Sequence, residues 1–264
     1  MNETYKVQVQ DLVDDLKAVF THAGLGGEAG EYKLLTQSFL YKFLNDKFLY
    51  QAKILDESNT YENLLAMSEE DYDWLLEDIG TSTAWLKPDQ LIETLHRQQN
   101  EATFYETFEN TLNQIAIDNN DIFSVHTDGD TAIRLFNERL ITDNISDSSK
   151  RNEVAKAIIN LLTRVKFDET IFSQGFDFFS TLFEYMIKDY NKDGGGKYAE
   201  YYTPHSVAKI IADILVGNDQ PSNVRIYDPS AGSGTLLMNL ASRIGVDKTT
   251  VYSQDISQKS SNLL

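Results

Sequence analysis

An acid, a proline and a glycine-rich turn carry the chemistry that this sequence suggests. Residues 224–227 form a short apolar run that predicts a strand, and the run stops at Asp228. Gly232 and Gly234 follow, and then the apolar spacing of a helix begins. Glycine lets the backbone approach a ligand closely, and a helix N-terminus offers unpaired N–H groups. The layout is typical of a nucleotide-binding loop, although a glycine-rich loop alone also occurs in ordinary turns.

A second acid stands at the end of another predicted strand. Residues 249–255 end at Asp255, 27 residues beyond Asp228. In open α/β sheets ligands bind outside the carboxyl ends of strands, where an acid accepts hydrogen bonds from ribose hydroxyls. The loop matches neither Gly-x-Gly-x-x-Gly nor Gly-x-x-x-x-Gly-Lys-Ser/Thr, and an acid before the glycines repels phosphate. A cationic or neutral nucleoside ligand fits better than a pyrophosphate.

The segment before this loop predicts a capped helix. Residues 200–205 read Glu-Tyr-Tyr-Thr-Pro-His, and apolar residues then recur at helical spacing through residue 215. Thr203 suits an N-cap and Pro204 the first helical position. Three glycines at 194–196 make a poor helix and predict a flexible joint.

The rest of the chain positions these residues and shows helical periodicity almost throughout. Period-two alternation is nearly absent before residue 190, so we predict an all-helical region in which the aromatics form the core and the acids of 68–78 a solvated face. A turn is expected at 128–130. Helices are expected over residues 5–20, 34–48, 68–79, 88–96, 104–115, 151–165 and 178–187.

These patterns predict two domains. Residues 1–190 would form an all-α N-terminal domain, residues 191–199 a glycine-rich joint, and residues 200–264 the start of an α/β domain. Strand, glycine loop, helix and second strand make a βαβ arrangement, the unit of a doubly wound sheet.

Composition limits the functions that the chain can have alone. The net charge is −18. Because binding to nucleic acid depends on Lys and Arg, these residues are not expected to provide the main contact with it. The chain has no cysteine and four scattered histidines, so we expect no metal site. No apolar run approaches the ~20 residues of a membrane span, and no signal peptide is evident. We expect a cytoplasmic protein without a membrane partner.

Two motifs together resemble a known family. Residues 228–234, Asp-Pro-Ser-Ala-Gly-Ser-Gly, resemble the S-adenosyl-L-methionine motif of N6-adenine DNA methyltransferases, and residues 200–204 resemble their companion motif. The motif order, after a helical domain, is similar to the modification (M) subunit of type I restriction–modification systems. Residues 34–48 and 178–188 are similar to that family's helices, so the resemblance covers most of the chain.

The resemblance implies a Rossmann-like S-adenosyl-L-methionine-dependent methyltransferase domain and its cofactor-binding residues. Segment 200–205 would border the cofactor and its methionine end, the glycine loop would pass close beneath it, and Asp255 would hold the ribose hydroxyls. Asp228 would orient the loop or meet the methionine amino group. The full set of expected cofactor-binding residues is Glu200, Tyr201, Tyr202, Thr203, Pro204, His205, Asp228, Gly232, Ser233, Gly234 and Asp255.

The sequence departs from the family pattern in three places. The family usually has Glu where Asp255 stands, and Ser253 replaces a frequent Gly. The Asn/Asp-Pro-Pro-Phe/Tyr segment, which in the family holds the target adenine, does not occur in these residues. We therefore expect a truncated methyltransferase domain without catalytic residues of its own, inactive by itself.

The implied function of the parent protein is methylation of adenine N6 in DNA after base flipping. A specificity (S) subunit would read the DNA, and a restriction (R) subunit is a further implied partner. Two alternatives stay open. One is a single-chain adenine methyltransferase with its own recognition region. The other is a noncatalytic module that docks partners and carries a vestigial cofactor pocket.

Overall fold

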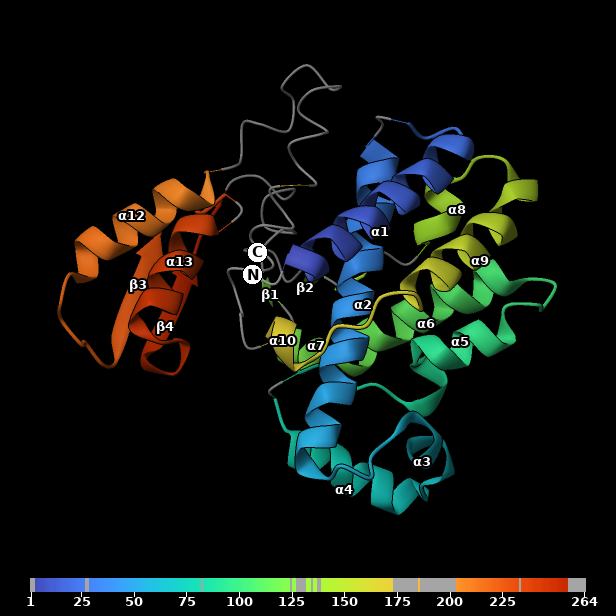
Figure 1. Ribbon diagram of the computed structural model, residues 1–264, viewed down its shortest axis with the longest axis horizontal. Coiled ribbons are helices and arrows are strands. Elements are labelled where there is room, and N and C mark those ends of the chain that lie inside the picture. Colours follow the sequence, from blue (N-terminus) through green and yellow to red (C-terminus); the bar gives the residue numbers. More distant parts are fainter. Residues whose placement is uncertain are drawn as a thin grey trace. The chain divides into compact units, whose positions relative to one another are not determined.

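The chain forms two compact units, one over Asn2–Ser173 and the other comprising Gln174–Leu264 together with Met1 (Figure 1). We call them the helical unit and the βαβ unit, and each is described by itself. The computed structural model describes residues 3–26, 29–81, 83–123, 125–126, 132–133, 135–136, 139–172, 185, 203–232 and 234–255.

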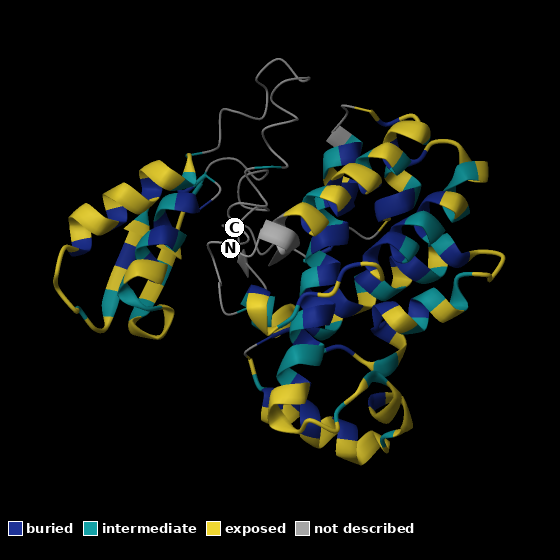
Figure 2. Ribbon diagram, viewed as in Figure 1, coloured by how far each residue is buried: buried dark blue, intermediate teal, exposed yellow. Residues whose placement is uncertain are grey.

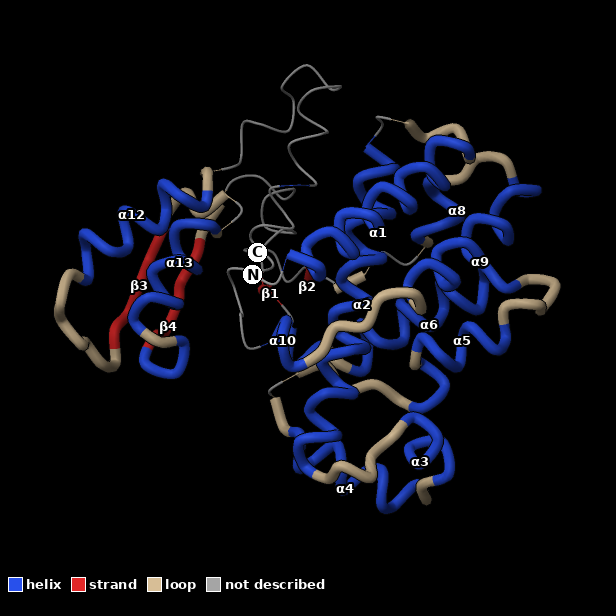
Figure 3. The backbone as a smooth tube through the Cα atoms, in the orientation of Figure 1, coloured by secondary structure: helices blue, strands red, loops and turns tan. Residues whose placement is uncertain are grey.

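Helices dominate the described part of the helical unit, as Figure 3 shows. Their lengths follow the apolar spacing of the sequence. The elements are α1 (Glu3–His22), α2 (Ala29–Leu55), α3 (Tyr61–Ala66), α4 (Glu69–Ile79), η1 (Pro88–Gln90), α5 (Ile92–Gln98), α6 (Phe104–Asp118), α7 (Asn120–Phe123), β1 (Val125–His126), β2 (Ala132–Ile133), α8 (Leu140–Asn144), η2 (Ser148–Lys150), α9 (Arg151–Leu162) and α10 (Glu169–Phe172).

Helix α2 is the central element of this unit. It contacts α1, α4, α8 and α9, and Figure 1 shows it running through the middle of the bundle. Its predicted apolar face is buried, with Leu34, Leu35 and Phe48 fully inaccessible to solvent. Burying such side chains contributes about 1.5–3 kcal/mol each, so this face supplies much of the core.

An ion pair lies inside the core on α2. The Lys42 Nζ is 2.8 Å from the Asp46 Oδ2, and both side chains are almost completely buried. Burial lowers the pKa of Lys42, and the nearby Asp46 carboxylate offsets part of that shift. Asp46 also accepts hydrogen bonds from Asn45 Nδ2 (2.8 Å) and from the backbone N–H of Phe167 (2.7 Å). Its carboxylate thus satisfies three donors and ties the segment after α9 to α2.

A second polar network joins α2 to the η1 turn and α6. The Tyr41 hydroxyl donates to the carbonyl of Gln90 (2.6 Å), and burial raises the pKa of this phenol. The Gln90 amide donates to Asp118 Oδ2 (3.0 Å), which also pairs with Lys87 Nζ at 3.1 Å. Asn45 Oδ1 accepts from the backbone N–H of Ile92 (2.9 Å). These buried polar groups all have partners, as a stable core requires.

The predicted helices of this unit are largely confirmed. Ser68 caps α4 by accepting from the Asp71 N–H (3.2 Å), and its hydroxyl donates back to the Asp71 carboxylate. The expected helix over 88–96 is split at Leu91 into η1 and α5. The turn at 128–130, the glycines 194–196 and, apart from Tyr185, the helix over 178–187 lie outside the described residues, and the domain boundaries stay a prediction.

The expectation of a purely helical region was wrong in one place. Val125–His126 and Ala132–Ile133 pair as two antiparallel strands, with Val125 opposite Ile133. Strands of two residues are too short for period-two alternation to appear in the sequence, so the pattern could not reveal them.

The βαβ unit holds a parallel pair of strands. Its described elements are α12 (His205–Val216), β3 (Val224–Asp228), α13 (Thr235–Ile244), η4 (Val246–Lys248) and β4 (Thr249–Ser253). β3 and β4 pair from Val224 opposite Thr249 to Asp228 opposite Ser253, so both strands end at the same edge. The core is small and consists of the buried side chains Ile226, Ala231, Leu237 and Ala241 with partly buried neighbours.

Helix α12 packs on α13 through its small residues. Ala208, Ala212 and Val216 are buried, and Arg243 near the end of α13 binds the Asp213 carboxylate (2.8 Å). The large aliphatic residues that form the helical pattern of the sequence are exposed, and the ribbon of α12 in Figure 2 is largely yellow. These residues are Val207, Ile210, Ile211, Ile214 and Leu215.

The start of α12 lies one residue later than predicted. Pro204 occupies the N-cap and its carbonyl accepts from the N–H groups of Val207 (3.0 Å) and Ala208 (3.1 Å). Thr203 is therefore not the cap. Proline has no side-chain acceptor, so α12 begins without a side-chain cap hydrogen bond.

No helix among the described residues combines the length and the apolar character needed to cross a bilayer.

Candidate functional site

The site begins where β3 ends. Asp228 is its last residue, and the Asp228 Oδ1 accepts a hydrogen bond from the backbone N–H of Ser230 at 2.9 Å. An aspartate that bonds the backbone two residues on forms a local turn. The carboxylate therefore turns the chain at the strand end and sets the direction of the glycine loop.

The two glycines of the loop have left-handed backbone angles. Gly232 has φ 57° and Gly234 has φ 71°, a region that residues with a side chain rarely adopt. Gly234 is the N-cap of α13, and its carbonyl accepts from the Met238 N–H at 2.9 Å. Glycine at these positions lets the chain turn sharply from strand into helix, with the helix N-terminus at the loop.

The loop is fastened to the chain that follows β4. The Gln254 N–H donates to the Asp228 carbonyl (2.9 Å), and the Ala231 N–H donates to the Gln254 carbonyl (2.9 Å). The backbone N–H of Gly232 donates to Asp255 Oδ2 at 2.8 Å. The two strand ends and the loop thus form one hydrogen-bonded unit, and Asp255 holds the loop at Gly232.

The structure brings together the predicted residues Asp228, Gly232 and Asp255, with Gly234 at the adjoining helix start. Thr203, Pro204 and His205 lie at the beginning of α12. The remaining predicted site residues Glu200, Tyr201, Tyr202 and Ser233 lie outside the described residues.

Helices α12 and α13 run in the same direction. The guanidinium of Arg243 in the last turn of α13 bonds both Asp213 Oδ1 and the Gly217 carbonyl at the end of α12, each at 2.8 Å. Because α12 and α13 pack against each other and their carboxyl ends meet, their starts at His205 and Thr235 lie toward the same end of the unit. The end that holds the glycine loop therefore also holds the start of α12.

Sequence reasoning missed two loop contacts, those of Ala231 and Gln254. Both act through backbone groups, and Gln254 also accepts from the Tyr227 hydroxyl at 2.8 Å through its side-chain oxygen. The adjacency of Gln254 to Asp255 was the only available signal, and it carries no information on backbone pairing.

The chemistry of the site follows from its carboxylates and loop geometry. Two aspartates at one sheet edge favour a ligand with cationic or hydroxyl groups over a phosphate. The described part of the chain contains no cluster of three His, Asp or Glu residues that could hold a metal ion. The arrangement suits a cationic or neutral ligand that carries hydroxyl groups.

The family model described as N-6 DNA Methylase matches residues 174–264, which include this loop. Residues 174–264 are therefore similar to the N-6 DNA methylase family. The resemblance to modification subunits of type I restriction–modification systems, inferred from two motifs, is thereby confirmed.

The relatives extend the likeness over the helical unit. The chain is 24% identical over 274 residues to the "Type I restriction enzyme MpnII methylase subunit" of Mycoplasma pneumoniae, covering 97% of this chain and 48% of that protein. It is 23% identical over 139 residues to the HindI methylase subunit of Haemophilus influenzae, covering 48% of this chain and 30% of that protein. The chain spans about half the length of the first relative and less of the second.

A solved structure shares the fold. The type I restriction–modification system methyltransferase subunit from Streptococcus thermophilus matches 97% of this chain and 54% of that chain, with a TM-score of 0.66 and 21% identity. Because the match covers 97% of this chain, both of its units have counterparts in the fold of that subunit.

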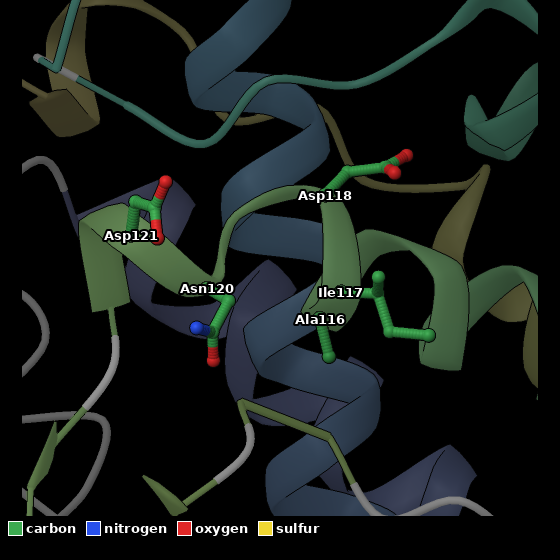
Figure 4. Close-up of a pocket in the computed structure, with 5 residues that line it drawn as sticks. All are labelled: Ala116, Ile117, Asp118, Asn120 and Asp121. Atoms are coloured by element: carbon green, nitrogen blue, oxygen red, sulfur yellow. The ribbon is translucent and has the colours of Figure 1, made fainter.

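A hollow in the helical unit offers no comparable chemistry. It is lined by Ala116, Ile117, Asp118, Asn120 and Asp121, where α6 passes into α7. Figure 4 shows the Asp118 carboxylate pointing away from Asn120 and Asp121. The Asp118 carboxylate pairs with Lys87 and accepts hydrogen bonds from Gln90 and Gln114, so its contacts stabilise the fold.

Proposed function

We propose that the βαβ unit binds S-adenosyl-L-methionine and that the parent protein methylates adenine N6 in DNA as the modification subunit of a type I restriction–modification complex. The observation that carries this proposal is the glycine loop between two parallel strand ends, held at Gly232 by Asp255 within the family-matched segment.

The residues present fit this cofactor. The Asp255 carboxylate has two oxygens with room for more than one donor, so it can hold Gly232 and receive ribose hydroxyls together. Asp228 directs the loop, and its negative charge favours the methionine ammonium group. Segment 200–205 would border the methionine end. When bound, the cofactor supplies a methyl group activated by its sulfonium sulfur.

In this proposal the chain supplies the cofactor side of the reaction. Residues 1–264 contain no Asn/Asp-Pro-Pro-Phe/Tyr segment to hold the target adenine, so we propose that they do not transfer methyl by themselves. The target base would be flipped out of the duplex to reach the cofactor.

Uncovered apolar surface supports a larger sheet around this unit. One face of the strand pair packs on α13 through Ile226 and Val251, whereas Tyr227 and Tyr252 on the other face are exposed. Parallel sheets are normally covered on both faces. We therefore propose that the unit belongs to a doubly wound, Rossmann-like methyltransferase domain whose other elements cover these surfaces.

The charge of the chain supports shared DNA binding. With a net charge of −18 the chain repels phosphates, so DNA would be held mainly through a specificity subunit. A restriction subunit is a further partner in this proposal.

Calorimetric titration of S-adenosyl-L-methionine into the chain tests the cofactor site. We expect binding by the native chain and a loss of about tenfold to a hundredfold in affinity for Asp255→Ala, because a hydrogen bond to a charged group contributes roughly 1.5–3 kcal/mol. Asp255→Asn keeps an oxygen for the Gly232 N–H but loses the charge, so its affinity should fall between the two.

The matched control is Asp219→Ala, which removes an exposed carboxylate outside the loop and should leave the affinity unchanged. Equal affinity of the native chain and Asp255→Ala, or the absence of binding by the native chain, would contradict the proposed site.

A further inference from the structure

An aromatic side chain stands exposed on a helix of the helical unit that is otherwise well packed. Trp74 on α4 is 61% exposed, the highest value among the large apolar aromatic side chains described. The opposite side of α4 is buried through Tyr72, Leu75, Leu76 and Ile79. Single exposed apolar residues are common, so exposure alone decides nothing.

The surroundings of Trp74 are distinctive. Residues three and four positions away on a helix are its surface neighbours. For Trp74 all four of these are acidic, namely Glu70, Asp71, Glu77 and Asp78. All four are exposed, and Figure 2 shows the outward side of α4 in yellow at the lower edge of the helical unit. We call Trp74 and these four residues the Trp74 surface.

Nothing in the described part of the chain neutralises this surface. None of the ion pairs between described residues involves its four carboxylates. Residues 54–79 contain nine Asp or Glu residues and no Lys or Arg. The same stretch exposes Ile54, Leu55 and Leu65, so acidic and apolar side chains are mixed here.

The platform under Trp74 is rigid. The Tyr72 hydroxyl donates to the Leu86 carbonyl at 2.7 Å, and its ring lies 6.4 Å from that of Phe48 on α2. Ser68 caps the helix start. Because α4 is anchored by its other side, Trp74 contributes little to the fold, and its ring is accessible to a partner.

A neighbouring contact shows the chemistry that such a surface recognises. The Arg97 guanidinium lies 4.7 Å from the centre of the Tyr61 ring and within 4 Å of the carboxylates of Glu62 and Glu93. Cations stack on aromatic faces, most strongly on Trp, and arginine combines stacking with paired hydrogen bonds to carboxylates. Trp74 with its four acids offers the same combination without an arginine.

We propose that the Trp74 surface docks an arginine-rich segment of a partner protein. Charge complementarity selects this occupant, because nucleic acid would be repelled by the carboxylates and an uncharged apolar segment would leave them unpaired. An arginine over Trp74 would pair with Glu70 or Glu77. This interaction is independent of the cofactor site in the βαβ unit.

Binding of a labelled peptide to the full chain tests this proposal. The probe is a 12-residue peptide with four arginines and two leucines among serine and glycine, followed by fluorescence anisotropy at low salt. We expect the native chain to bind it, Trp74→Ala to bind about tenfold more weakly, and Glu70→Lys/Glu77→Lys to lose more. All substituted side chains are exposed, so circular dichroism should show unchanged folding.

The matched control is Asp11→Lys/Glu153→Lys, which makes the same change in net charge at exposed positions of α1 and α9. It should reduce binding by no more than about twofold, since distant surface charges are screened. No binding by the native chain, equal binding by Trp74→Ala, or an equal loss in the two charge-reversal variants would overturn the proposal.

Discussion

The two units of the chain differ in how they use their apolar residues. In the helical unit the large side chains of α2 are buried, and the buried polar groups Lys42 and Asp46 satisfy each other and their neighbours. In the described part of the βαβ unit the strand core has four buried side chains, while five large aliphatic residues of α12 and the tyrosines of β3 and β4 are exposed.

This difference indicates that the two units have different structural roles. The helical unit closes its own core, so its stability depends on internal contacts. The described part of the βαβ unit covers one face of its strands, while Pro229 and Ser230 at the start of the loop are exposed and Asp228, Gly232 and Asp255 are half-buried.

The largest expected effect is in the buried network of the helical unit. Asp46→Ala leaves the Lys42 ammonium buried without a counter-charge and removes the acceptor of the Phe167 N–H. Breaking such a pair costs about 3–5 kcal/mol. Urea unfolding followed by tryptophan fluorescence would measure it, because both tryptophans, Trp74 and Trp85, lie in this unit.

Lys42→Met is the comparison for that experiment. It removes the cation but leaves Asp46 with hydrogen bonds from Asn45 and Phe167, so its cost should be clearly smaller. A cost below about 1 kcal/mol for Asp46→Ala would show that the pair is not a stabilising element.

A somewhat smaller effect should separate covered from uncovered residues of the βαβ unit. Leu237→Ala empties part of the small core and should cost about 2–5 kcal/mol, toward the lower end because a small unit can collapse. Ile214→Ser on the exposed face of α12 should change stability by less than about 0.5 kcal/mol. Hydrogen exchange of the α13 amides would measure the loss of stability in both variants. Similar losses for the two substitutions would contradict the difference between covered and uncovered residues.

Backbone strain gives a third, smaller prediction. Gly234→Ala forces a side chain into a left-handed conformation and should cost about 1 kcal/mol. Gly217→Ala is the comparison at the end of α12, where an added Cβ has no neighbour within 4 Å. Gly217 has φ 56° and ψ −130°, outside the left-handed helical region of Gly234 and in a region that residues with a side chain rarely adopt. Gly217→Ala should therefore destabilise the chain at least as much in thermal unfolding, whereas only Gly234→Ala should weaken cofactor binding. Equal weakening of cofactor binding by both substitutions would show that the glycine loop has no specific role in the site.

The smallest effect concerns acid stability. Burial acts to raise the pKa of Asp118, but hydrogen bonds from Gln114, Gln90 and Lys87 outweigh it, and the net pKa is lowered. A carboxyl with a lowered pKa stabilises the fold above its ordinary value of 3.8, and this contribution is lost as the pH falls through the lower folded-state pKa.

Relative to Asp118→Asn, the native chain should therefore lose stability as the pH falls below about 4. The loss should be less than about 1 kcal/mol, because the Lys87 side chain of the Lys87–Asp118 pair is exposed. Thermal unfolding between pH 5 and 3 would measure the difference. A native advantage that grows on acidification would contradict the assignment.

The sequence allowed the helices and the glycine loop to be predicted because both depend on local spacing. The apolar positions of α2 and the Ser68 cap of α4 are examples. The contact of Asp46 with Phe167 joins residues 121 positions apart, and no local pattern contains it.

At the site, the sequence pointed to Asp228, Gly232 and Asp255, but not to the bond between Gly232 and Asp255. The sequence also did not show which face of α12 is buried. Helical periodicity shows that a face is apolar, but only the partner helix decides that the alanine face is buried, because small side chains permit close packing on α13.

The central claim is that the glycine loop and the two strand ends form the cofactor site. Hydrogen exchange of the full chain with and without S-adenosyl-L-methionine tests it most directly. We expect added protection at residues 228–234 and 253–255 and no change over α2 or α9. Protection confined to the helical unit, or no protection at the loop under saturating cofactor, would contradict the account.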